Sequence, residues 1–172
     1  MTNESWSDEL AKRIGREVAR LRGQQSMQWL SDRTAEAGKR VSKVSISELE
    51  NGKRKSVSVA DLVILAAALG VPPIELLYPG MPDAKVEGLP GQVDMSWKVA
   101  QWFSGEKSKD TLVGMVRRRE ELRTLIKHNE KALRYTDNPE RAVGHTEWIE
   151  KYERQLVELD EAIRAAGGVI DE

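Results

Sequence analysis

The 172-residue sequence contains no cysteine and only two histidines. The absence of cysteine excludes disulfide bonds and thiolate metal sites, and two histidines are too few for the usual zinc centres. No apolar run approaches the roughly 18 residues that a membrane-spanning helix needs. The first residues also lack an apolar signal segment, so we expect a cytoplasmic protein without a metal site, a cofactor or a membrane partner.

The motifs of common catalytic sites are missing as well. The sequence has no glycine-rich phosphate loop, no metal-ligand spacing and no nucleophile–histidine–acid set. His128 and His145 lie within predicted helices among polar residues, and we expect them to face solvent or the preceding segment rather than transfer protons. The sequence therefore does not predict an enzyme.

Charge is distributed unevenly along a chain whose formal net charge is only -1. Residues 11–60 contain twelve Lys or Arg and five Asp or Glu, a balance of +7. Residues 81–172 contain fifteen and eighteen, a balance of -3. A local positive region is what a DNA-contacting face requires, and a solvated basic surface is the alternative interpretation.

Residues 7–78 are predicted to form one compact unit of five short helices, because apolar residues recur at helical spacing between cap and stop residues. Ile46 and Leu49 are expected to hold the third helix in the core, and Thr34 and Ala37 of the second helix are expected to face inward. The expected caps are Ser7 or Asp8, Ser26, Ser42 and Ser58, and the expected ends are Gly23, Gly38, Asn51–Gly52, Gly70 and Pro79.

Residues 79–107 are predicted to form a connector with an aromatic docking segment. Turn signals occur at residues 79–82 and 89–91. The aromatic segment should form one helix or a buried strand and turn, with its rings packed in a core or an interface. A ligand-binding aromatic cage is the alternative. The apolar residues of this segment are Trp97, Val99, Trp102 and Phe103.

Residues 108–167 are predicted to form an antiparallel hairpin of two long helices. Apolar residues of the second helix step by three and four, which is the coiled-coil rhythm, and Pro139 fits its first turn. A two-helix hairpin buries little surface, so we expect it to be a dimerisation element. Alternatively, its helices pack only on each other and on Trp97 and Trp102.

Five ordered segments resemble the DNA-binding domain of Xre-type (Cro/C1-type) helix-turn-helix regulators, and more weakly those of actinobacteria and actinophages. The resemblance implies an all-α fold, with a five-helix lambda-repressor-like domain followed by the aromatic connector and the helical hairpin. One departure is the segment 34–41, which is longer than the family's usual tight turn. The matching segments are Ile14–Arg22, Ser26–Leu30, Val44–Lys53, Asp61–Pro72 and Ile74–Leu77.

The resemblance implies that the third helix, expected at residues 42–51, enters the DNA major groove. Lys43 can donate to guanine, Val44 can pack on a thymine methyl group, and Ser45 and Ser47 can bond a base edge or a phosphate. Gln28 can contact phosphate or adenine. The residues expected to contact phosphate are Lys39, Arg40, Lys53, Arg54 and Lys55.

The leading hypothesis is a sequence-specific transcription regulator, a repressor that binds double-stranded operator DNA as a homodimer. Its half-sites would lie about one helical turn apart. The alternative is a protein-binding adaptor, or an antitoxin-like partner, that docks through the hairpin. Binding to DNA would weaken steeply with salt, whereas a protein partner would be retained. The operator, the regulated genes, the inducing signal, activation as opposed to repression, and a phage or host role stay open.

Overall fold

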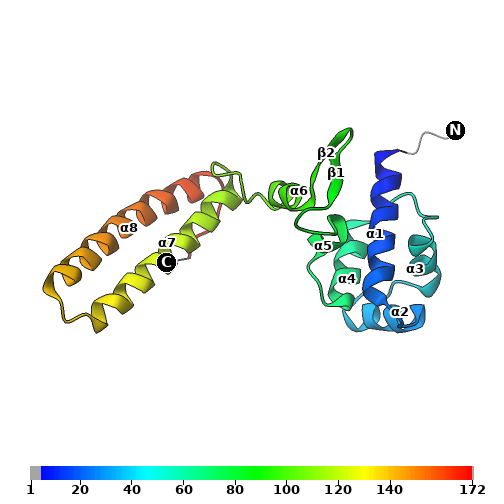
Figure 1. Cartoon of the computed structure of the whole chain (residues 1–172), viewed down its shortest axis with the longest axis horizontal. Coiled ribbons are helices and arrows are strands. Elements are labelled where there is room, and N and C mark those ends of the chain that lie inside the picture. The colour runs from blue at the N-terminus through cyan, green and yellow to red at the C-terminus, as the bar shows by residue number, and fades with distance from the viewer. Residues whose placement is uncertain (1–4, 172) are drawn as a thin grey trace. The chain divides into compact units, whose positions relative to one another are not determined.

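The structure is a computed structural model that describes residues 5–171, which form eight helices and two short strands. The chain divides into two compact units, the first reaching Ala100 and the second beginning at Gln101. Within the described residues, no helix is long and apolar enough to cross a membrane. The predicted all-α class is confirmed, with one β-hairpin in addition (Figure 1).

Five helices form the bundle of the first unit, and a serine side chain caps four of them by accepting a backbone N–H bond. The caps at Ser26, Ser42 and Ser58 are confirmed. The prediction of Ser7 or Asp8 was wrong, because Ser5 is extended and accepts from the Asp8 N–H at 3.3 Å. The helices are α1 (Trp6–Arg22), α2 (Met27–Glu36), α3 (Lys43–Glu50), α4 (Val59–Leu69) and α5 (Pro73–Leu77).

The core of the bundle takes at least one fully buried apolar side chain from each helix, and the predicted burial of Ile46 and Leu49 is confirmed. Thr34 is buried as expected, and its hydroxyl oxygen accepts the Val41 N–H at 2.9 Å. Ala37 is exposed instead, because α2 ends at Glu36 and the chain turns away. One side chain with no exposed surface from each of the five helices is, in chain order, Val18, Leu30, Ile46, Leu65 and Leu76.

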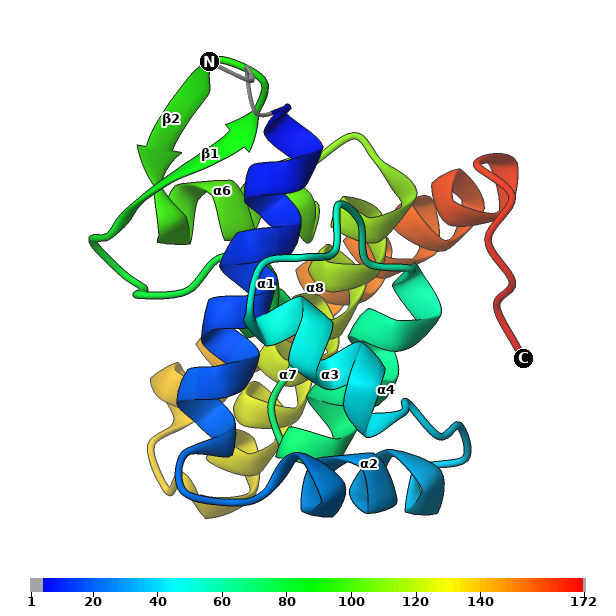
Figure 2. The same ribbon diagram turned by 90° about the vertical axis from the view of Figure 1, so that its right-hand side faces the viewer.

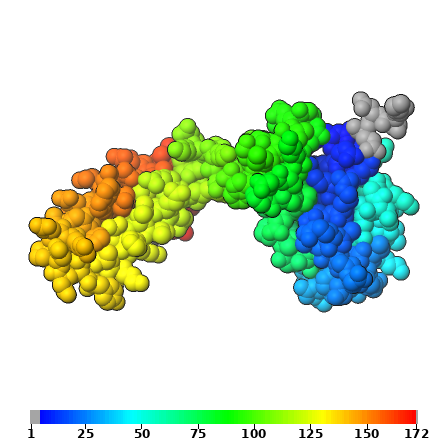
Figure 3. Space-filling model, viewed as in Figure 1, coloured from blue at the N-terminus to red at the C-terminus, as the bar shows by residue number. Residues whose placement is uncertain are grey.

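Two features hold α3 against α1. A Cβ atom on Gly15 would lie 2.1 Å from the Leu49 carbonyl oxygen, so only glycine permits this approach of the two backbones. The Arg22 guanidinium also donates to both carboxylate oxygens of Glu50, each at 2.7 Å. This ion pair is largely buried, with 15% and 5% of the two side chains exposed. The space-filling view shows these helices in close contact (Figure 3).

The connector begins with an antiparallel hairpin of β1 (Lys85–Leu89) and β2 (Gln92–Met95), which pairs Val86 with Asp94. Arg13 of α1 lies over the Tyr78 ring and donates to the Glu87 carbonyl at 3.1 and 3.2 Å, which ties β1 to the bundle. Desolvation lowers the pKa of Arg13, and burial also raises the pKa of Tyr78.

The following helix, α6 (Ser96–Phe103), buries small residues rather than its rings. Val99 and Ala100 join the core of the first unit. The large aromatic residues do not pack in the core, because the buried stripe of this short helix is occupied by smaller side chains, and their packing in an interface stays a prediction. The exposed fractions of Trp97, Trp102 and Phe103 are 46%, 53% and 56%.

The second unit contains the predicted hairpin of α7 (Leu112–Tyr135) and α8 (Pro139–Ala165), which lie side by side (Figure 1). Asn138 caps α8 by accepting the N–H groups of Glu140 and Arg141, as expected from its position before Pro139. Among the described residues from 101 onward, only Leu122 and Ile163 are buried apolar side chains. The hairpin therefore has a thin core.

Two polar pairs join α7 and α8. Arg119 donates to the Asp160 carboxylate at 2.5 Å, and the Nδ1 atom of His145 lies 2.9 Å from the Asn129 side-chain oxygen. The expectation that His145 faces solvent or the connector was wrong, because Asn129 on the facing helix is its hydrogen-bond partner. His128 is exposed. These pairs set which residues of the two helices face each other.

Candidate nucleic-acid interface

The outer face of α3 is the centre of the candidate interface. Ile46 and Leu49 point into the core, so the opposite face of the helix points outward. Lys43 and Glu48 are exposed, and 59% of Val44 is accessible. Figure 2 shows α3 at the surface of the bundle, above α2. An exposed valine beside a lysine at a helix start suits a surface that reads both methyl groups and base acceptors.

The serine hydroxyls of α3 already take part in hydrogen bonds within the protein. The Ser42 and Ser45 hydroxyl oxygens lie 3.0 Å apart, and the Ser42 oxygen accepts the Ser45 N–H. The Asn51 amide donates to the carbonyl and the hydroxyl of Ser47. A hydroxyl has one donor and two acceptor sites, so Ser45 and Ser47 keep capacity for a further partner.

The chain leaves α3 through Gly52, whose φ of +67° is a left-handed conformation that glycine adopts without strain. This turn places Lys53, Arg54 and Lys55 directly after the helix. Lys53 and Lys55 are exposed, whereas Arg54 is half-buried. The basic run is therefore adjacent to α3, as the sequence predicted, but its three members differ in environment.

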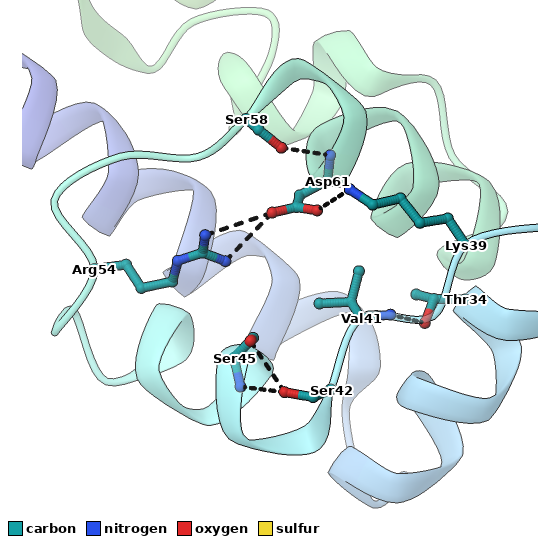
Figure 4. Close-up of polar contacts among 8 residues, drawn as sticks. All are labelled: Thr34, Lys39, Val41, Ser42, Ser45, Arg54, Ser58 and Asp61. Atoms are coloured by element: carbon teal, nitrogen blue, oxygen red, sulfur yellow. Dashed lines mark hydrogen bonds and ion pairs between the residues drawn. The ribbon is translucent and has the colours of Figure 1, made fainter.

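Arg54 and Lys39 share one acidic partner, Asp61 in the first turn of α4 (Figure 4). The Lys39 ammonium donates to Oδ1 of Asp61 at 2.7 Å, and both terminal nitrogens of Arg54 lie 3.4 Å from Oδ2. The hydrogen bond from Lys39 is the main reason that the pKa of Asp61 lies below its ordinary value. Asp61 is thus anionic at neutral pH and offsets part of the local positive charge.

Arg40 and Gln28 share a second acidic partner, Asp32 of α2. Arg40 donates to Oδ1 of Asp32 at 2.8 Å, and the Gln28 amide donates to the same oxygen at 3.0 Å. The bond from Arg40 is the main reason that the pKa of Asp32 is lowered. Both predicted contact residues are exposed, so each remains accessible to a ligand from outside.

Six cations were predicted to contact DNA, and three of them have an acidic partner in the protein. Within residues 5–171, Lys43, Lys53 and Lys55 form no ion pair and are exposed. Six cations against Asp32, Asp61 and the exposed Glu48 of α3 leave a charge of +3 among these nine side chains. The same part of the chain holds no group of three acidic or histidine side chains that could bind a metal ion.

The acidic partners were not identified as site residues from the sequence. Asp61 follows Ser58 by three positions, a pattern that indicates helix capping. The cap itself forms, because the Ser58 hydroxyl accepts the Asp61 N–H at 3.0 Å. The carboxylate, however, contacts two loops that lie 22 and 7 residues away in sequence. No local pattern indicates such a contact.

Comparison with known proteins adds one match. The family model described as helix-turn-helix matches residues 18–76, about a third of the chain. The matched range includes every residue predicted to contact DNA. It supports a helix-turn-helix regulator of the Xre (Cro/C1) type, a kind of protein that binds DNA and regulates transcription. No curated protein and no solved structure matches this chain.

Proposed function

We propose that this protein, whose residues 18–76 form a helix-turn-helix region, is a sequence-specific transcription regulator that reads the DNA major groove with α3. The observation that carries the proposal is the two-sided character of this helix. Ile46 and Leu49 hold it in the core, while Lys43 and Val44 are exposed at its start. In this proposal Lys43 donates to guanine, Val44 contacts a thymine methyl group, and Ser45 and Ser47 bond base edges or phosphate.

Phosphate contacts would hold α3 in register on the duplex. Lys53 and Lys55 supply the accessible charges directly after α3. Arg40 and Gln28 are exposed beside each other near the start of α2 and complete the surface. Lys39 and Arg54 contribute more weakly, because phosphate would have to compete with Asp61 for them.

We also propose that the protein acts in the cytoplasm as a dimeric repressor on a two-fold operator. The thin core of the α7–α8 hairpin supports this, because a second hairpin would bury apolar side chains that one copy leaves accessible. Two bundles on one operator add their binding free energies, and the bound dimer would occupy DNA that the transcription machinery needs. The exposed side chains of this hairpin include Val113, Val116, Val143, Trp148 and Val157.

The experiment that tests this proposal is selection of duplexes from a random DNA library with the purified full chain, at low and at moderate salt. We expect enrichment of a two-fold motif and loss of that motif for Lys43→Ala. Gln24→Ala, an exposed residue outside the predicted interface, is the matched control and should retain the motif. Retention of DNA without any motif, or no retention at low salt, would contradict the regulator proposal.

A second candidate function is a protein-binding adaptor that docks through the hairpin. The observation that favours it is the exposed Trp148 on α8, whose ring stacks on the half-buried Tyr152 at 5.5 Å between centroids and lies under Lys151. Sedimentation of the purified protein separates the candidates. A concentration-dependent dimer that Trp148→Ala weakens would support the first proposal. A protein that stays monomeric at all concentrations would support the adaptor, with another protein as the partner of α8.

A further inference from the structure

Asp61 contacts the segments on both sides of α3 although it lies on α4. Lys39 belongs to the loop that enters α3, and Arg54 belongs to the loop that leaves it. Figure 4 shows both side chains reaching toward the one carboxylate. Only 14% of the Asp61 side chain is exposed, compared with 48% of Lys39 and 28% of Arg54. The acid is therefore the inner member of a three-residue cluster, and its two cations are the outer members.

The backbone that carries the Asp61 carboxylate is fixed by contacts other than those with its two cations. The Ser58 hydroxyl accepts the Asp61 N–H and fixes the first turn of α4, while Leu65 one turn further on is fully buried in the core. Helix α4 is thus a rigid base for this side chain. The loops are different, because Lys39 and the residues at 51, 53, 55 and 56 are exposed. Because Asp61 lies on this fixed helix, its ion pairs restrain the two loops, and the loops do not position Asp61.

Restraint at both ends matters because α3 is only eight residues long. Its inner face packs on α1 and α2, which sets its depth in the bundle. Ile46, Leu49 and the ion pair of Glu50 with Arg22 hold the helix against the bundle, and the loops that enter and leave it set the placement of its two ends. Bidentate and methyl contacts with bases need side chains placed to within a fraction of an ångström.

From this geometry we infer that Asp61 is a positioning residue for sequence reading, which orients α3 by holding the loop before it through Lys39 and the loop after it through Arg54. The inference rests on the proposed function and deepens it. Asp61 does not contact DNA. Loss of the Asp61 carboxylate would not reduce nonspecific attraction to phosphate, because no cation is removed. It would make the positions of the base-contacting residues less well defined, so the protein would discriminate less between base pairs.

The test compares Asp61→Asn with wild type on two duplexes, the selected operator and a scrambled sequence of equal length. We expect operator affinity to fall about tenfold, the effect of roughly one lost base contact. Affinity for the scrambled duplex should not fall, because the change removes no cation and frees Lys39 and Arg54 from a competing carboxylate, and the salt slope should be unchanged or steeper. Glu36→Gln is the matched control, since it removes one carboxylate from an exposed pair with Arg33.

Three results would overturn the inference: an unchanged ratio of operator to scrambled affinity, an equal loss on both duplexes, or tighter binding to both with a steeper salt slope. The last result would show that Asp61 only masks Lys39 and Arg54. Hydrogen exchange of the free protein gives a readout that is independent of DNA. Asp61→Asn should speed exchange in the loops at 39–42 and 52–58 while the amides of α1 and α4 keep their protection.

A second variant covers the case in which Asp61→Asn does not fold. Lys39→Gln changes an exposed loop residue and leaves the core intact. If Lys39 positions the loop, this change lowers the affinity ratio of operator to scrambled duplex; if it only contacts phosphate, affinity falls equally on both. If the wild-type protein selects no motif, the proposed function itself is contradicted. If it selects a motif but the variants keep the wild-type ratio of operator to scrambled affinity, only the role of Asp61 is contradicted.

Discussion

The two units of the chain are held together in different ways. Among the described residues, sixteen buried apolar side chains lie in the unit that ends at Ala100, and two lie in the unit that begins at Gln101. The helices of the second unit are also joined by two polar pairs, Arg119 with Asp160 and Asn129 with His145. Burial of apolar surface is the dominant favourable contribution to folding, so the first unit should be much the more stable.

This difference between the two units fits the two roles proposed for them, DNA reading for the first and dimerisation for the second. A helix that reads DNA must keep its position, and the first unit gives α3 a close-packed core and a buried ion pair. A hairpin that joins two copies needs accessible apolar side chains before it meets its partner, and the second unit leaves them exposed. Substitutions in each unit test this difference.

Removing a core side chain from each unit tests the contrast most directly. We expect Leu49→Ala to lower the free energy of unfolding of the first unit by about 4 kcal/mol, and Leu122→Ala to cost the second about 2 kcal/mol, because its few neighbours can close the space. Hydrogen exchange read separately over residues 5–100 and 101–171 measures both. Equal losses in the two units would contradict the contrast between a thick and a thin core.

Breaking the buried ion pair is the next largest change. Glu50→Gln leaves the Arg22 guanidinium with a neutral partner in a site where 15% of its surface is exposed. We expect a loss of about 3 kcal/mol in the free energy of unfolding, measured by urea titration. Arg118→Gln, which breaks an exposed pair with Glu121 in the hairpin, should cost less than about 0.5 kcal/mol. Similar costs for the two variants would show that the pair between α1 and α3 behaves as a surface pair.

Removing one accessible lysine should change DNA binding without changing stability. We expect Lys53→Ala to make the slope of log affinity against log salt shallower by about 0.9 for each lysine lost, since each releases one counterion. Lys107→Ala in the second unit, also exposed, is the control and should leave the slope unchanged. An unchanged slope for Lys53→Ala would remove this residue from the phosphate contacts.

Acid should weaken the first unit slightly through Asp61. Its pKa is lowered in the folded protein, mainly by the hydrogen bond from Lys39, so its contribution is present above the ordinary pKa and is lost as pH falls through the lowered one. We expect the urea midpoint to fall as the pH drops below the ordinary pKa of an aspartate, and to fall less for Asp61→Asn. An equal fall in both proteins would assign the acid sensitivity to other carboxylates.

Most of the helical architecture could be predicted from the sequence, but the connector could not. Ser26, Ser42, Ser58 and Asn138 mark helix starts correctly, because a cap acts on amides within three residues of itself. The hairpin of β1 and β2 was missed, although residues 89–91 were identified as a turn. Its strands are only five and four residues long, and Arg13 of α1, more than 70 residues away, secures it.

Local sequence patterns were enough to predict where α2, α3 and α4 begin and which face of α3 enters the core, since periodicity and capping depend on residues within one or two turns. Which charges near α3 have an acidic partner depends on the tertiary structure. Lys39 and Lys53 are both exposed lysines in basic stretches, yet folding brings the first to Asp61 on α4, while the second forms no ion pair within residues 5–171. The reason is physical: an ion pair depends on distance in space, and the fold of α4 against the two loops sets that distance.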